Sequence, residues 1–109
     1  MHEINFSKEY ELKYRTIELD LIRSGYPNKT IQKILKHMDD QQHALLIHPE
    51  LGAKMEIKTG VPSRMRYLIT KPYIQLYAAI PTAEEANDFD SVFMVTMYYL
   101  KSNYLAKLY

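Results

Sequence analysis

The feature of this sequence that most constrains its fold is the order of patterns in its first 38 residues. A short run with β-prone residues, 2–6 (HEINF), is followed by two helical patterns, and a break at 25–28 (GYPN) separates them. A strand and a tight pair of helices cannot bury their own apolar faces. We therefore expect the rest of the chain to supply a sheet on which the two helices pack.

An apolar stripe at helical spacing predicts the first helix over residues 8–24, with Ser7 as its N-cap. Gly25 is expected to end this helix in the left-handed conformation, and Pro27 prevents simple continuation. The residues of the stripe are Tyr10, Tyr14, Ile17 and Leu21.

A second helix is expected after Asn28, which can act as its N-cap. Its apolar face follows the i, i+3, i+4, i+7 pattern. Asp39 and Asp40 oppose the dipole at a helix C-terminus, so we expect the helix to fray there. Residues 41–49 are then a connection, with a short helical turn as an alternative for 44–47. The apolar face consists of Ile31, Ile34, Leu35 and Met38.

From Ala53 onward the hydrophobic period changes to that of strands. Met55 and Ile57 alternate with charged residues, which predicts a strand over 53–58 before a turn at 59–63. The whole chain, 1–109, is predicted to be one α+β domain: an N-terminal strand, a helical hairpin on an antiparallel sheet of three to four strands, and a short C-terminal helix or arm at 101–109. The further strands are expected at 65–70, 73–80 and 92–100, with a break at Lys71-Pro72 and a polar loop at 81–91.

Composition excludes several classes of protein. A chain of 109 residues with 47% hydrophobic and 25% charged residues is typical of a single globular domain. No run approaches the roughly 20 apolar residues that span a bilayer, and no signal-peptide pattern is visible, so we expect a cytoplasmic protein without membrane contact. The absence of cysteine excludes disulfides and thiolate metal sites. A net charge of +1 argues against unspecific binding of polyanions.

One cluster of cations stands out in the expected sheet. Lys54, Lys58, Arg64 and Arg66 lie within 13 residues, around a turn. They could contact phosphate groups, or they could form the solvated face of an antiparallel sheet. The pattern by itself leaves both interpretations open.

Other chemistry-bearing residues favour structural roles. His43 and His48 lack a companion carboxylate at ligand spacing, so surface or loop packing is the preferred interpretation, and no metal or cofactor is predicted. Most of the ten tyrosines fall in helix stripes or strands, where aromatic residues pack. Tyr104 and Tyr109 are the exceptions, because the terminal segment near Lys101 could reach a ligand.

The predicted order of elements, strand, helix, helix and then three or four antiparallel strands, resembles the RelE/ParE superfamily of bacterial toxins. Residues 3–11 (EINFSKEYE) are similar to the family's first strand and helix start, and 25–28 (GYPN) to the break between its helices. Residues 48–52 (HPELG) are similar to the loop before the sheet. Residues 92–99 (VFMVTMYY) with 101–104 (KSNY) are similar to the last core strand and the segment after it.

In the ribonuclease members of that family, basic residues hold the scissile phosphate and a Tyr or His transfers a proton. Such a set is needed because cleavage by a 2′-hydroxyl develops charge on the phosphate and requires an acid and a base. The resemblance implies Lys58, Arg66, Lys101 and Tyr104 as the catalytic residues, the first three as phosphate ligands and Tyr104 in proton transfer.

The resemblance also implies supporting contacts and partners. Lys54 and Arg64 are nearby candidates for RNA binding, whereas Glu56 stands where a second lysine would be expected. The first functional hypothesis is a toxin of a toxin–antitoxin system, an endoribonuclease that cleaves mRNA, with an antitoxin protein and mRNA or the ribosome as partners. The alternative is a non-catalytic protein-interaction module, phage- or plasmid-encoded or ParE-like, that binds a protein target.

Overall fold

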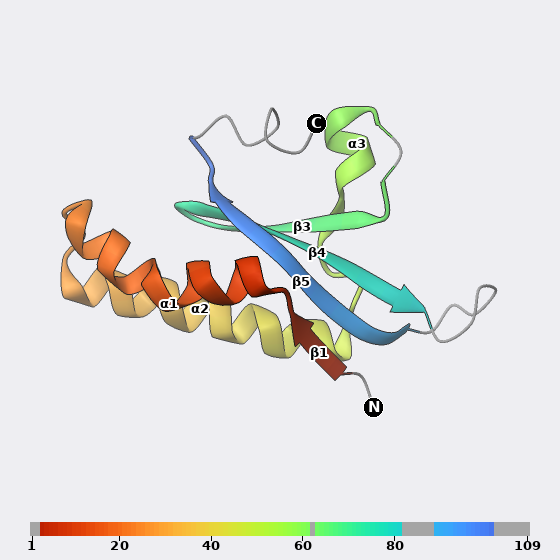
Figure 1. Ribbon diagram of the computed structural model, residues 1–109, viewed down its shortest axis with the longest axis horizontal. Helices are drawn as coiled ribbons and strands as arrows, with labels where there is room; N and C mark the ends of the chain where they lie inside the picture. Colours follow the sequence, from red (N-terminus) through yellow and green to blue (C-terminus); the bar gives the residue numbers. More distant parts are fainter. Residues whose placement is uncertain (1–2, 62, 82–88, 102–109) are drawn as a thin grey trace.

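The computed structural model describes residues 3–61, 63–81 and 89–101, which form three helices and five strands (Figure 1). The predicted α+β architecture, with a helical hairpin packed on a sheet, is confirmed. In chain order the elements are β1 (Glu3–Phe6), α1 (Lys8–Arg23), α2 (Asn28–Ile47), β2 (Ala53–Lys54), α3 (Met55–Thr59), β3 (Met65–Thr70), β4 (Tyr73–Pro81) and β5 (Phe89–Tyr99).

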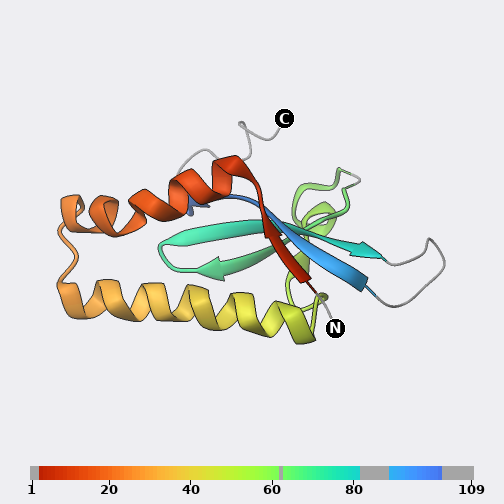
Figure 2. The same cartoon turned by 60° about the horizontal axis from the view of Figure 1, so that its bottom comes forward.

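The five strands form one mixed sheet in the order β1-β5-β4-β3-β2. β1 runs parallel to β5, and every other neighbouring pair is antiparallel. The chain starts with β1 at one edge of the sheet. The hairpin of α1 and α2 then connects β1 to β2, which is at the opposite edge. Figure 2 shows the two helices side by side, and Figure 1 shows the β3–β4 turn above them.

The start and end of α1 follow the predicted local signals. The Ser7 side chain accepts a hydrogen bond of 2.9 Å from the backbone N–H of Tyr10, which makes Ser7 the N-cap. Gly25 has φ of 87°, the left-handed conformation expected after the helix. Tyr10, Ile17 and Leu21 of the predicted stripe are buried.

The predicted boundaries of α2 were wrong at both ends. The helix continues through Asp39 and Asp40 to Ile47, because Leu45 is fully buried in the core and Lys36 forms an ion pair of 3.0 Å with Asp40. Burial of a further apolar residue therefore outweighs the local preference for a stop. At the start, Pro27 occupies the N-cap position, and Asn28 is the first helical residue.

The strand predicted over 53–58 was also wrong beyond its first two residues. β2 ends at Lys54 and α3 follows at once. The alternating pattern would place Met55 and Ile57 on one face, but Met55 is fully buried while Ile57 is 79% exposed. In the helical conformation, Met55 packs on Ile74 and Leu76. These two residues lie on the face of the sheet opposite the hairpin, so α1 and α2 cannot cover them.

The remaining strands lie close to their predicted positions. β3 has the predicted bounds, β4 ends one residue later than expected, and β5 begins at Phe89 and ends at Tyr99. The polar loop predicted at 81–91 was wrong at both ends, because Pro81 belongs to β4 and residues 89–91 belong to β5. Its middle part, 82–88, and the predicted C-terminal helix or arm beyond Lys101 lie outside the described residues. Among the described residues, no helix is both long and apolar enough to cross a membrane.

Side chains of β4 alternate between two apolar clusters on opposite faces of the sheet. Tyr73, Gln75 and Tyr77 face α1 and α2, whereas Ile74 and Leu76 face α3. The larger cluster joins the hairpin to the sheet, and the smaller cluster lies beneath α3.

A polar network crosses the larger cluster. Gln75 is fully buried, and its side-chain carbonyl accepts a hydrogen bond of 2.5 Å from the Tyr10 hydroxyl. Its amide donates to Gln41 Oε1 at 3.0 Å and to Thr70 Oγ1 at 2.8 Å. The network therefore links α1, α2, β3 and β4, and it satisfies polar groups that water cannot reach.

Replacing Gln75 with leucine is expected to lower the free energy of unfolding by about 1–3 kcal/mol, because the buried Tyr10 and Thr70 hydroxyls lose a partner. Urea unfolding followed by circular dichroism measures this change. The matched control is Gln32→Leu, at an exposed position of α2, which should change the free energy by no more than about 0.5 kcal/mol. Equal effects of the two substitutions would contradict the role of the network.

Candidate functional site

The structure brings Arg66 and Lys54 together at the edge of the sheet. The two residues are directly opposite each other on β3 and β2, and Tyr77 of β4 lies opposite Arg66 on its other side. Tyr77 belongs to the cluster beneath the hairpin. Directly opposed residues share a face, so Lys54 and Arg66 are on the face that carries α1 and α2.

The Arg66 guanidinium holds the loop between α2 and β2. Its Nη1 donates to the carbonyl of Gly52 at 2.8 Å and to that of Glu50 at 3.2 Å. Beside it, the buried Tyr77 hydroxyl donates to the Pro49 carbonyl at 2.8 Å and accepts from the Gly52 N–H at 2.7 Å. Burial raises the pKa of Tyr77, although the Gly52 N–H and the charge of Arg66 act in the opposite direction.

Gly52 is required at this point for steric reasons. A Cβ atom on Gly52 would lie 2.6 Å from the carbonyl oxygen of Tyr67 and 2.7 Å from Cε1 of Tyr77. Both neighbours are fixed, one as backbone of β3 and the other as a buried ring. The motif HPELG, which carried part of the family resemblance, therefore has a structural function in seating the loop.

Lys58 lies on the opposite face of the sheet from Arg66. It is in the last turn of α3, and its Nζ is 5.2 Å from the centroid of the Tyr67 ring. This distance is within the range of a cation–π interaction. The sequence pattern predicted one strand over 53–58 and therefore placed Lys58 near Arg66. Because the chain turns into α3 after Lys54, Lys58 instead lies over the face opposite Arg66.

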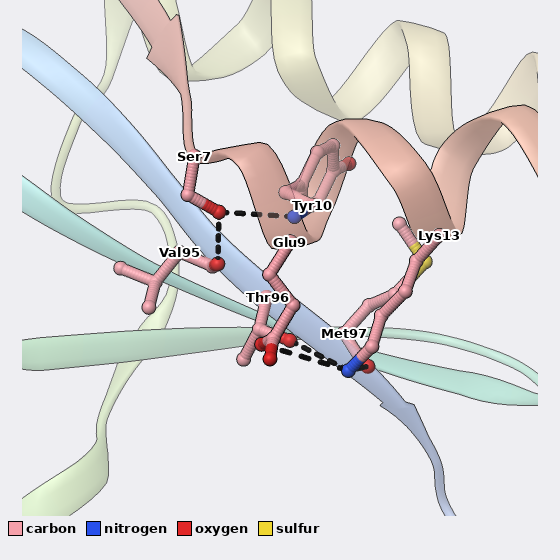
Figure 3. A network of polar contacts seen from close by, with 7 residues as sticks. All are labelled: Ser7, Glu9, Tyr10, Lys13, Val95, Thr96 and Met97. Atoms are coloured by element: carbon pink, nitrogen blue, oxygen red, sulfur yellow. Dashed lines mark hydrogen bonds and ion pairs between the residues drawn. The ribbon is translucent and has the colours of Figure 1, made fainter.

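Lys13 supplies a second cation on this face, and the sequence analysis did not select it. Its Nζ is 3.9 Å from the centroid of the Tyr98 ring. It donates to Thr96 Oγ1 at 2.8 Å and to the Met97 carbonyl at 2.9 Å, and it is 3.6 Å from the Glu9 carboxylate (Figure 3). No local pattern indicated Lys13, because its contacts are with residues more than 80 positions away in the sequence. Lys13 can reach β5 because β1 pairs with β5 only as far as Met94.

The face beneath α3 therefore combines cations with aromatic rings. Tyr67 and Tyr98 both pack against the small cluster of Met55, Ile74 and Leu76. Each of the two rings has a lysine ammonium group over it. We call this surface the α3 face, defined by Lys58, Tyr67, Lys13 and Tyr98.

The other predicted site residues lie elsewhere. Arg64 is exposed just before β3, and Lys101 is exposed just after β5. The Leu100 N–H donates to the Pro72 carbonyl at 2.9 Å, which places Lys101 near the end of β3 that is farther from Arg64. A six-residue strand is about 20 Å long, so these two cations are not in one cluster. Tyr104 lies outside the described residues.

The histidines and acidic residues of the described part form no metal-binding group of three or more. His43 and His48 are both exposed, and the Nδ1 of His43 is 2.8 Å from the carbonyl of Asp39. These contacts are those of surface histidines on and beside α2.

Comparison with known protein families finds no family that matches this chain, and no curated protein matches it either.

Replacing Gly52 with alanine is expected to lower the free energy of unfolding by about 1–3 kcal/mol, because the new Cβ overlaps fixed atoms of the sheet. Chemical unfolding measures the loss. Ala53→Ser, at the exposed neighbouring position, should stay within about 0.5 kcal/mol of the unsubstituted protein. A stable Gly52→Ala protein would show that the loop is not seated as described.

Alkaline pH is expected to destabilise the fold. Burial raises the pKa of Tyr10, Tyr14, Tyr73 and Tyr77. In the unfolded chain tyrosine titrates near pH 10, so the stabilisation is complete below about pH 10 and is lost as the pH rises toward the higher folded pKa values. Urea unfolding at a series of pH values measures this loss. It should be smaller in Tyr10→Phe, and an equal loss in both proteins would contradict the assignment.

Proposed function

We propose that this chain is a RelE/ParE-like toxin domain that contacts RNA through the α3 face. The order of elements supports the proposal, because a strand, a helical hairpin and then a series of antiparallel strands is the arrangement on which the family resemblance rests. The motifs at 25–28 and 48–52 support it as well, since they form the hairpin break and the loop before the sheet.

The observation that carries the proposal is the placement of Lys58 over Tyr67. Single-stranded RNA is bound by cations along its backbone and by aromatic rings on which its bases stack. Lys58 is exposed and Tyr67 is half-buried, so a phosphate can approach the ammonium group and a base can approach the part of the ring that the cluster and Lys58 leave uncovered. Lys13 and Tyr98 repeat this combination on the same face.

Within this proposal Arg66 has a supporting role. Its contacts with the carbonyls of Glu50 and Gly52 hold the loop that precedes β2 and α3. It thereby positions the short segment that carries Lys58. The predicted catalytic function of Lys101 and Tyr104 remains a prediction, with Tyr104 outside the described residues.

A second candidate function is a non-catalytic module that binds a protein target. Three observations favour it: the Arg66 guanidinium is used by the loop, Ile57 on α3 is 79% exposed, and Glu56 stands on α3 where the family resemblance leads us to expect a lysine. An exposed apolar residue among charges of both signs is typical of a protein-binding surface. In either case we propose an antitoxin protein as a partner, and a short reading frame beside the gene would support it.

Inducible expression with transcript mapping tests the proposal. The unsubstituted chain is expected to arrest growth with cleaved transcripts, and Lys58→Ala should weaken arrest at least about tenfold, the effect of losing one charge-assisted contact. Lys36→Ala removes an exposed charge from α2 and should leave arrest unchanged. Full arrest in Lys58→Ala would contradict the α3 face as the RNA contact. Arrest with intact transcripts would favour the protein-binding module.

Salt dependence of RNA binding separates the two candidates. Phosphate contacts release counterions, so the affinity of the purified protein for a single-stranded RNA oligonucleotide should fall steeply between about 50 mM and 200 mM salt. Fluorescence anisotropy measures this affinity. Lys58→Ala should give a shallower salt dependence, and an affinity that does not respond to salt would argue against RNA as the target.

A further inference from the structure

A cavity of about 550 Å³ lies where the helical hairpin meets the end of the sheet, and none of the four residues that define the α3 face lines it. Its volume is within the range of small-molecule sites. Its walls come from the hairpin break, the start of α2, the β3–β4 turn and the end of β5, and Figures 1 and 2 show the β3–β4 turn pointing toward the end of the molecule where the hairpin break lies. The lining residues are Tyr26, Thr30, Ile34, Lys71, Pro72, Tyr99, Leu100 and Lys101. We call this cavity the hairpin cleft.

The walls of the hairpin cleft are apolar and aromatic. Tyr99 is 37% exposed, and its ring lies 4.7 Å from that of the buried Tyr73, whose hydroxyl donates to the Tyr99 hydroxyl at 3.3 Å. This contact holds the Tyr99 ring in place. Tyr26 packs against the same core from the hairpin side. The cleft therefore presents aromatic surface with a fixed orientation, which suits a planar ring.

Two lysines lie beside these walls. Lys71 comes from the β3–β4 turn and Lys101 from the end of β5, and the hydrogen bond from the Leu100 N–H to the Pro72 carbonyl joins the two segments. Within 3–61, 63–81 and 89–101, neither ammonium group has an acidic partner at ion-pair distance. The nearby Asp20 lines a neighbouring cavity together with Lys13. Tyr99 lines both cavities, and the residues that line the hairpin cleft include two lysines and no carboxylate.

We propose that the hairpin cleft binds one nucleotide, with the base against Tyr99 and Tyr26 and the phosphate between Lys71 and Lys101. Aromatic walls alone would suit any planar apolar group, and lysines alone would suit any anion. Only a ligand that joins a planar ring to an anionic group uses both features. The nucleotide is either a free monophosphate or one unit of an RNA strand, and both have the same chemistry.

The proposal goes beyond the α3 face and can fail independently of it. The hairpin cleft shares none of Lys58, Tyr67, Lys13 or Tyr98. It also gives Lys101, which the family resemblance selected as a phosphate ligand, a partner in Lys71 that the sequence analysis did not select.

Titration of the full chain with adenosine 5′-monophosphate, followed by NMR chemical shifts, tests the proposal. The monophosphate should bind at least about tenfold more tightly than adenosine or inorganic phosphate, because only it uses both features of the cleft. The shifts should be confined to residues around Tyr26, Lys71, Tyr99 and Leu100. Equal affinity for the three ligands, or shifts elsewhere, would overturn the proposal.

Substituted proteins distinguish binding of the monophosphate in the hairpin cleft from unspecific attraction of its phosphate to surface lysines. Lys71→Ala, at an exposed turn position that should not affect folding, is expected to weaken monophosphate binding about tenfold. Lys36→Ala removes the same charge from an exposed position of α2 and should leave binding unchanged. Tyr99→Leu should weaken it, whereas Tyr99→Phe should retain it. Unchanged binding in Lys71→Ala, or an equal loss in Lys36→Ala, would contradict the assignment.

Competition distinguishes the two sources of the nucleotide. If the monophosphate displaces a short RNA oligonucleotide, and Lys71→Ala weakens both, the cleft holds one unit of the RNA strand. If the monophosphate binds without displacing the oligonucleotide, the cleft is a site for a free nucleotide. Both results support the proposal. The growth-arrest experiment with Lys58→Ala tests the α3 face separately.

Discussion

The open edge of β5 is the constraint on which the arrangement of this domain depends. β1 pairs with β5 only as far as Met94, so the carbonyls beyond that point need other partners. Ser7 meets this need at the junction: its N–H donates to the Met94 carbonyl at 2.9 Å and its hydroxyl to the Val95 carbonyl at 2.5 Å. Lys13, further along α1, then donates to the Met97 carbonyl (Figure 3). Ser7 therefore both starts α1 and provides partners for the carbonyls of β5. Lys13 adds a second contact, which aligns α1 with β5.

This alignment determines which chemistry each face of the sheet receives. Because α1 and α2 cover the face of Tyr77, Arg66 faces the loop after α2 and stabilises it. The opposite face is left to a five-residue helix, α3, which buries Met55 and leaves Lys58 over Tyr67. Arg66, which stabilises the loop, and Lys58 with Tyr67, which form the candidate RNA contact, are thus on opposite faces of the sheet, although all three lie within a short stretch of the chain.

Local signals predicted most of the elements. The bounds of β3, the Ser7 cap, the Gly25 conformation and the buried stripe of α1 follow from hydrogen-bonding and steric preferences within a few residues. The two largest errors have one common cause. Asp39 and Asp40 indicated a helix end, and Met55 with Ile57 indicated a strand, but the burial of Leu45 and Met55 against distant elements outweighed both patterns.

Periodicity and capping residues were sufficient for the order and type of the main elements, and for an α+β fold with a hairpin on a sheet, because these depend on interactions between near neighbours. They could not assign side chains to faces or bring distant segments together. The turn into α3 separates Lys58 from Arg66, and Lys13 reaches Tyr98 past the end of β1. The pairing of β4 with β5 brings Lys71 and Lys101 to the same cavity. Each of these outcomes is set by contacts between residues far apart in the chain, which a local pattern does not contain.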